Sequence, residues 1–220
     1  MTRIPALRTL AIAGLVAFGS AAFPVAAIDV DFDIAAGISL SDDTRLFVNL
    51  SNNHYGPNPD VALTVLHKVP NPGNDFPVLL FLAAESGKSI EALWSMRRSG
   101  LTWAEVQFRA GVPTARIFAG LDNDPGPPYG KAWGHWKNKG KGKGHTSGVH
   151  LSDTEFVNLV KVQITSKHFG LSPHEVIRAQ SSGKKVEAFA REHHYNRGGK
   201  KPSGTTKKSS NPGKGKGKKK

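Results

Sequence analysis

Cysteine is absent from the 220 residues of this chain. Its absence excludes a disulfide scaffold, a thiolate nucleophile, cysteine-ligated zinc and a lipid-modified N-terminal cysteine. After the first twenty-odd residues, no run is apolar enough to span a bilayer. Only 38% of the residues are hydrophobic, and 24 glycines and 14 prolines interrupt the chain. This composition leaves room for one modest core and excludes a large multidomain enzyme.

The one long apolar run covers residues 10–22 and follows a short basic stretch. Small residues at 25 and 27 occupy the two positions that a signal peptidase reads, which predicts cleavage before Ile28. Residues 1–27 are therefore predicted to be a signal peptide of the Gram-negative type, without a lipobox cysteine. The mature chain is predicted to be periplasmic or secreted, where a protein without cysteine has nothing to misoxidise.

Negative charge is missing from two stretches of the chain. The whole sequence has 30 basic and 17 acidic residues, for a formal net charge of +13. Residues 131–145 hold five lysines and no acid, and residues 197–220 hold ten basic residues and no acid. The rest of the predicted mature chain is mildly acidic. Both stretches are rich in Gly and Lys and cannot fold alone, so residues 197–220 are predicted to be a disordered tail and the affinity for polyanions is placed in these appendages.

Helix start and stop signals recur from residue 58 onward. Capping boxes pair Thr102 with Glu105 and Ser152 with Glu155. The signals predict helices over 61–68, 77–86, 90–98, from 103 to a stop at Gly111, from Thr114, from 153 to Gly170, from 173 to Gly183, and from 186 towards Tyr195. The sequence therefore predicts a mainly α domain at 28–196. Two helical modules, 58–120 and 151–195, are joined by a basic aromatic linker at 121–150.

A short β element is predicted at the start of this domain. Residues 28–34 alternate four apolar side chains with three aspartates, a period of two that is typical of a strand. A turn-prone cluster at 41–44 precedes Leu46, Val48 and Leu50, which alternate in the same way and favour a hairpin or a pair of edge strands. The aspartates lack the glycine-containing loop and the distal glutamate of a calcium site, so no metal is assigned to them.

The two modules share a pattern of capping residues. An offset of 83 residues aligns Gly87 with Gly170, Ser89 with Ser172, Ser99 with Ser182 and Gly100 with Gly183. This pattern indicates a degenerate internal repeat. The alternative is chance, because Ser and Gly caps are common in helical proteins.

Residues 100–119 resemble a helix-turn-helix. Gly111 stands at the turn, Thr102 starts the first helix, and Arg109 and Arg116 are placed to contact phosphate. The resemblance implies a DNA-binding protein. A structural helical hairpin has the same spacing and is favoured, because an exported protein is separated from chromosomal DNA by a membrane.

The linker combines aromatic rings with lysines. Prolines and glycines over 122–137 predict the absence of regular structure, and Tyr129, Trp133 and Trp136 lie between lysines. Flat rings beside positive charge suit nucleic acid, an acidic glycan or anionic lipid headgroups. The predicted contacts are Lys131, Trp133, Trp136, Lys137, Lys139, Lys141 and Lys143, with Lys214, Lys216 and Lys218 of the tail. The alternative, which the behaviour of large rings favours, is that the aromatics cover the helical core.

Two stretches carry a resemblance to known proteins. The chain reads DPGPPYGKAWG from Asp124 and FPVLLFLA from Phe76. In these stretches it resembles a group of uncharacterised exported bacterial proteins. The resemblance implies export and a shared fold over most of the mature chain, and it implies no activity, cofactor or catalytic residue.

Nine histidines raise the question of metal binding or acid–base chemistry. No two of them are spaced i, i+4, and only His168 and His174 flank a helix junction, at Gly170. Scattered surface histidines are favoured, and no nucleophile elbow or phosphate-binding glycine loop is present. No catalytic residue, metal or cofactor is predicted. The leading function is an exported non-enzymatic binding or structural protein of the cell envelope; the alternatives are the helix-turn-helix DNA-binding protein and an envelope hydrolase or histidine-dependent metal protein.

Overall fold

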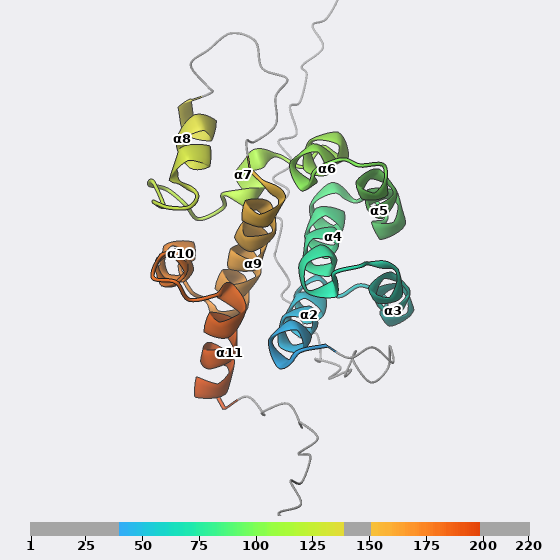
Figure 1. Ribbon diagram of the computed structural model, residues 1–220, viewed down its shortest axis with the longest axis horizontal. Helices are drawn as coiled ribbons and strands as arrows, with labels where there is room; N and C mark the ends of the chain where they lie inside the picture. The colour runs from blue at the N-terminus through green and yellow to red at the C-terminus, as the bar shows by residue number, and fades with distance from the viewer. Residues whose placement is uncertain (1–39, 139–150, 199–220) are drawn as a thin grey trace, which may run out of the picture.

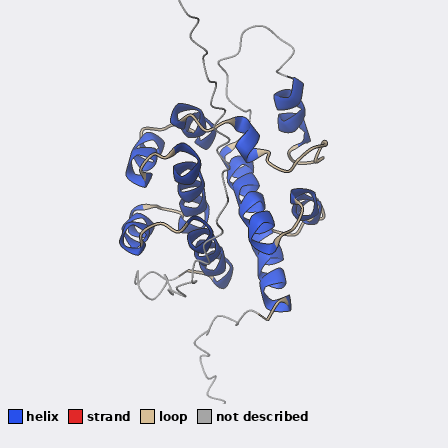
Figure 2. Ribbon diagram, turned by 180° about the vertical axis from the view of Figure 1, so that it is seen from behind, coloured by secondary structure: helices blue, strands red, loops and turns tan. Residues whose placement is uncertain are grey.

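The fold is helical throughout the part of the chain that the structure describes. A computed structural model describes residues 40–138 and 151–198, and within these ranges it contains helices and no strand (Figures 1 and 2). The helices are α2 (Asp42–Tyr55), α3 (Pro59–Lys68), α4 (Pro72–Ser86), α5 (Ile90–Arg98), α6 (Trp103–Ala110), α7 (Thr114–Ile117), α8 (Gly130–Asn138), α9 (Asp153–Phe169), α10 (Pro173–Ser181) and α11 (Val186–Asn196). The predicted mainly α class is confirmed, and the strand predicted at 28–34 lies outside the described residues. Among the described helices, none has both the length and the apolar character to cross a bilayer.

The strand predicted over Leu46, Val48 and Leu50 is wrong, because these residues lie in α2. Residues 41–44, expected to form a turn, instead start the helix. The hydroxyl oxygen of Ser41 accepts a hydrogen bond from the backbone amide of Thr44 at 3.4 Å. All three apolar residues are buried, and so is Phe47 between them. An alternation of only five residues fits a broad helical face as well as a strand, and the N-cap decides for the helix.

Helices α4 and α9 lie side by side at the centre, with the other helices around them (Figure 1). Every residue is buried over 76–82 in α4 and over 159–166 in α9. Helix α4 begins five residues before the predicted start, with Pro72 at its first position and Pro77 inside it. Proline is well tolerated at a first helical position, where no intrahelical partner for its missing amide is needed. Most buried polar side chains find a hydrogen-bond partner, but in the part of the chain that the structure describes the hydroxyls of Thr165 and Ser166 in α9 have none.

Lys161 is the largest buried polar side chain of α9. Its side chain is only 2% exposed. The ammonium donates to Oδ1 of Asn74 at 2.7 Å and to the carboxylate of Glu187, and it lies 5.6 Å from the ring centre of Phe47. One charged group of α9 therefore contacts α4, α11 and α2.

The order of helices in the first module recurs in the second. Helices α5 and α10 begin 83 residues apart, and so do α6 and α11. Left-handed glycines, Gly87 and Gly170, end α4 and α9 at the same spacing, and Ser89 and Ser172 cap α5 and α10. The 83-residue offset indicated by the sequence is thus present in the helices themselves. The modules pack together through α4 and α9 into one core.

The linker is more ordered than the sequence predicts. Residues 130–138 form α8, so the expected absence of regular structure is wrong there. Gly130 can start the helix close to the preceding turn, because a Cβ at this position would lie 2.7 Å from Oδ1 of Asp124. The hydroxyl of Ser181 in α10 donates to the carbonyl of Pro127 at 2.6 Å, which fastens the turn to the second module.

We expect Glu187→Gln to lower the free energy of unfolding by about 3 kcal/mol, because the buried ammonium of Lys161 would keep only amide partners. Glu192→Gln is the matched control: Glu192 pairs with Lys184 at 2.6 Å, but both side chains are largely exposed. Surface pairs contribute little to stability, so little change is expected in the control. Urea unfolding at neutral pH measures both variants.

The pH dependence of stability checks the same pair. Burial alone would raise the pKa of Glu187, but the charge and the hydrogen bond of Lys161 hold it below its ordinary value. The carboxylate therefore stabilises the fold above the ordinary glutamate pKa of about 4.3, and this contribution is lost as the pH falls through the lower folded-state value. Glu187→Gln should show a flatter stability profile in that range. A variant as stable as the parent at every pH would show that the pair has no such role.

Candidate functional site

The predicted basic contacts in the described residues lie on α8. Lys131 and Lys137 are both exposed. The ammonium of Lys137 lies 5.5 Å from the ring centre of Trp133 and 5.0 Å from that of Trp136, within reach of cation–π attraction. Of the remaining predicted contacts, Lys139, Lys141 and Lys143 of the linker and Lys214, Lys216 and Lys218 of the tail lie outside the described residues.

The aromatic residues of this segment attach it to the core. Tyr129 is fully buried, and Trp133 and Trp136 are half-buried. The ring of Trp136 stacks on Phe118 with centres 5.2 Å apart, and the indole N–H of Trp133 donates to the carbonyl of Leu121 at 3.0 Å. Most of each ring faces the protein, as the core-covering interpretation expects. The exposed positive charges of α8 are therefore the ammonium groups of Lys131 and Lys137, and that of Lys137 lies close to both indole rings.

The helix-turn-helix-like stretch forms only part of that motif. Thr102 and Glu105 make the predicted capping box, and Gly111 has the left-handed conformation (φ 80°) expected at the turn. The second helix, α7, has four residues and is about 6 Å long, whereas the major groove is about 12 Å wide. Arg109 is exposed, but Arg116 pairs with Glu85 at 3.2 Å. The stretch has the geometry of a compact corner and does not supply a recognition helix.

His168 and His174 are not part of a cluster of three candidate metal ligands among the described residues. Within residues 40–138 and 151–198, no three His, Asp or Glu side chains are arranged to hold a metal ion. The ring of His168 instead lies edge-on to Phe169 at 4.7 Å. Partial burial lowers its pKa, and the nearby His194 and His54 lower it further. The ends of α2, α9 and α11 thus bring histidines together without a ligand geometry.

One concentration of polar side chains in the described residues was not predicted from the sequence. Two adjoining pockets, of about 310 and 430 Å³, open where α4 and α9 begin. We call them the polar groove. The first is lined by Asn71, Asn74, Asp75, Arg97, Trp103, Asp153, Thr154, Val157 and Asn158, and the second by Asn74, Thr154, Asn158, Gln180, Gly183, Lys184, Lys185, Val186 and Glu187. Asn74, Thr154 and Asn158 belong to both.

The 83-residue offset relates the two pockets. It carries Asn71, Asp75, Arg97 and Trp103 of the first pocket onto Thr154, Asn158, Gln180 and Val186 of the second. Each pocket therefore uses the start of both central helices and one flanking helix pair. The repeat in the sequence was the one signal that could have indicated this site, but only the packing of α4 against α9 brings its halves together.

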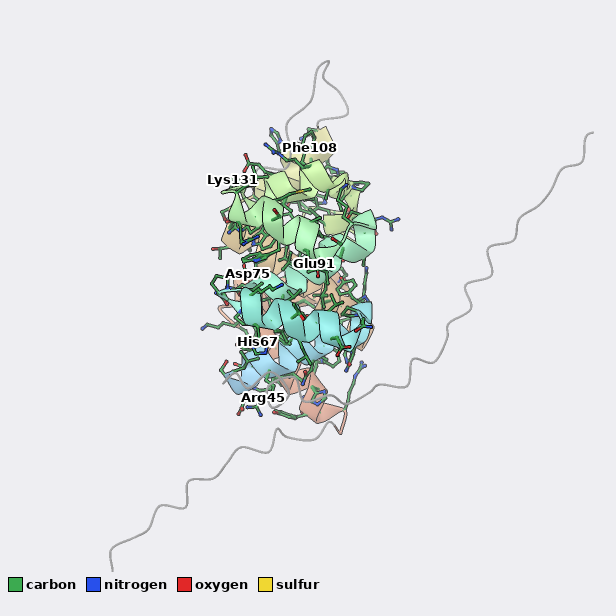
Figure 3. All side chains as sticks on the ribbon, turned by 90° about the vertical axis from the view of Figure 1, so that its right-hand side faces the viewer. Arg45, His67, Asp75, Glu91, Phe108 and Lys131 are labelled. Carbon is green, nitrogen blue, oxygen red and sulfur yellow. The ribbon has the colours of Figure 1, made fainter. Side chains whose placement is uncertain are left out.

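A network of charges organises the first pocket. Asp153, at the first position of α9, accepts from Arg97 at 2.5 Å and from the backbone amide of Trp103 at 2.8 Å. Arg97 also lies 4.9 Å from the Trp103 ring centre. Asp75 is half-buried nearby: burial raises its pKa, and the Asn71 amide and Arg97 oppose this rise. Figure 3 shows Asp75 midway along the molecule, away from the end where Lys131 and Phe108 lie. None of the residues that line the groove belongs to α8.

The histidine-rich end predicts a loss of stability in mild acid. Burial lowers the pKa of both His54 and His168, so the folded state favours their neutral forms. The resulting stabilisation is present above the ordinary histidine pKa of about 6.5 and is lost as the pH falls below it. We expect the melting temperature to fall less between about pH 8 and pH 5 in His168→Gln than in the parent protein. His67→Gln, at an exposed position of α3 (Figure 3), is the control and should keep the parent profile; equal profiles for all three proteins would contradict this account.

Comparison with known proteins gives no family for this arrangement. No family model, curated protein or solved structure matches the chain. The resemblance carried by the segments at 76–83 and 124–134 therefore stays a prediction. The residues of α8 and of the polar groove are the two candidate functional surfaces among the described residues.

Proposed function

We propose that the protein is an exported, non-enzymatic protein of the cell envelope that binds anionic polymers through α8 and the lysine-rich segments of its linker and tail. The observation that carries the proposal is the exposure of Lys131 and Lys137 on α8, which leads directly into Lys139, Lys141 and Lys143. A run of ammonium groups attracts polyanions by displacing their condensed counterions, without needing a shaped cavity.

Helix α8 holds the first two lysines of this positively charged run in a fixed position on the protein. The stacking of Trp136 on Phe118 and the hydrogen bond from Trp133 hold the helix against the core. Lys137, close to both indole rings, is oriented more firmly than a lysine in a Gly/Lys-rich segment would be. A polymer held by the linker would therefore meet α8 at one defined edge of the molecule.

Substitution of both α8 lysines tests this role. We expect Lys131→Ala with Lys137→Ala to weaken binding of a single-stranded oligonucleotide and to reduce the steepness of its salt dependence by about 1.4 on a log–log scale, because two phosphate contacts are lost. The matched control is Lys68→Ala with Lys88→Ala, which removes the same charge from exposed positions outside α8. Fluorescence anisotropy over a salt series measures both.

The outcomes separate the contributors. The triple variant Lys214→Ala, Lys216→Ala and Lys218→Ala measures the tail in the same way, and polygalacturonate as the competing probe measures preference for an acidic glycan. Binding that does not respond to salt would overturn the proposal. An equal loss in the α8 pair and in the control pair would show that α8 has no special part in it.

Export is tested by the N-terminus of the mature protein. If residues 1–27 act as a signal peptide, the protein recovered from outside the cytoplasm begins at Ile28. Mass spectrometry of the intact protein from periplasmic and cytoplasmic fractions gives the answer. A full-length protein confined to the cytoplasm would contradict export and would restore DNA as an accessible polyanion.

A further inference from the structure

The polar groove has features of a binding site that polyanion binding does not explain. No residue of α8 lines it, and four of its six charged side chains are ion-paired within the protein. The other two, Asp75 and Lys185, have opposite charges. Asp153 pairs with Arg97 at 2.5 Å, Glu187 pairs with Lys161, and Lys184 pairs with Glu192 at 2.6 Å. A ligand with a large net charge would have to compete with these ion pairs. The groove therefore favours an uncharged ligand.

Hydrogen bonds from buried side chains fix the orientation of two side-chain amides in the groove. Oδ1 of Asn74 accepts from Lys161, which can only donate, so the NH2 group of Asn74 is left as a donor. Oε1 of Gln180 accepts from the hydroxyl of the buried Tyr129 at 2.9 Å, which leaves its NH2 group in the same role. The core thus sets the direction of two donors, one at the wall shared by the pockets and one in the second pocket.

Other polar side chains that line the groove can also donate or accept hydrogen bonds. The side chains of Asn71, Thr154 and Asn158 make no hydrogen bond to any other residue in the described ranges. Asp75 adds a carboxyl group whose pKa is raised by burial. A hydroxyl group both donates and accepts, so a chain rich in hydroxyls matches such a mixed array better than a ligand with acceptors alone.

The size and repetition of the groove set the length of the ligand. Pockets that hold small molecules measure about 300–1,000 Å³, and each of the two pockets, at about 310 and 430 Å³, reaches that range alone. They share Asn74, Thr154 and Asn158, so one ligand can occupy both. The 83-residue offset places four corresponding positions of the chain in the two pockets, with different side chains. Two adjoining, related pockets suit a chain of repeated units.

We propose that the polar groove binds a neutral oligosaccharide, with neighbouring sugar units in the two pockets. Asn74, Asn158 and Gln180 provide directed hydrogen bonds to hydroxyl or acetamido groups, and Thr154 lies at the wall between the units. This site is distinct from α8 and does not depend on polyanion binding.

The test uses the full chain, labelled with ¹⁵N, and three probes: the tetramers of β-1,4-linked N-acetylglucosamine, β-1,4-linked glucose and α-1,4-linked glucose. We expect at least one tetramer, at up to millimolar concentration, to shift the side-chain amide signals of Asn74, Asn158 and Gln180. Since no charge is exchanged, the dissociation constant should change less than about twofold over the salt range that weakens polyanion binding.

Variants assign the site. Asn158→Leu and Gln180→Met each remove one hydrogen-bonding group and should weaken binding roughly fivefold to tenfold. Thr154→Val keeps the shape of the side chain and removes only its hydroxyl, so it tests the groove even if Asn158→Leu or Gln180→Met fails to fold. Asn123→Leu is the matched control, because it removes an exposed amide from a loop outside the groove, and it should bind as the parent does.

Three results would overturn the proposal: no groove signal shifts with any tetramer, the groove variants bind as the control does, or an uncharged Gly–Ser peptide shifts the groove signals when no tetramer does. Failure here is distinguishable from failure of the proposed function. Oligonucleotide binding responds to Lys131 and Lys137 and to salt, whereas oligosaccharide binding responds to Asn158 and Gln180 and not to salt.

Discussion

The burial of α4 and α9 on all sides is the constraint on which the rest of the structure depends. Helix α4 meets it with apolar side chains over residues 76–82. Helix α9 cannot, because Lys161, Gln163 and Thr165 lie in its buried stretch. The fold therefore places Asn74 and Glu187 beside the ammonium of Lys161. It also places the backbone carbonyls of Ile117 and Ala119 beside the side-chain amide of Gln163. Neighbouring helices are positioned by the polar groups they must satisfy as well as by apolar packing.

The same buried groups support the groove above them. Lys161 orients Asn74 and neutralises Glu187, and Tyr129 orients Gln180. Side chains at the surface of the groove are held by hydrogen bonds that originate in the core. Such preorganisation reduces the ordering that a ligand must impose when it binds. The linker supports the groove through Tyr129, whereas Lys131 and Lys137 of α8 are not among the residues that line it.

Two surfaces of different chemistry thus lie on one small domain. The surface of α8 carries unopposed positive charge and leads into a lysine-rich segment. The groove carries ion-paired charges and amides, and positions 83 residues apart along the chain line its two halves. At two of these positions the side chains differ in charge: Arg97 corresponds to Gln180 and Asp75 to Asn158. The two pockets therefore differ in polarity while they keep the same construction.

Most of the helices could be predicted from the sequence, because capping is local: Ser89, Thr102 and Ser152 satisfy amides within three residues of themselves. Alternation over 46–50 predicted a strand and failed, since five residues fit two periods; the Ser41 N-cap and the burial of Phe47 separate them. Proline and glycine composition predicted no regular structure over 122–137, but contacts with Leu121 and Phe118 hold α8 in place. The sequence alone determined the helical class, the helices other than α2 and α8, and the 83-residue spacing. Only the tertiary structure decided the groove and the partners of Lys161, because both depend on side chains that are far apart along the chain and meet when α4 packs against α9.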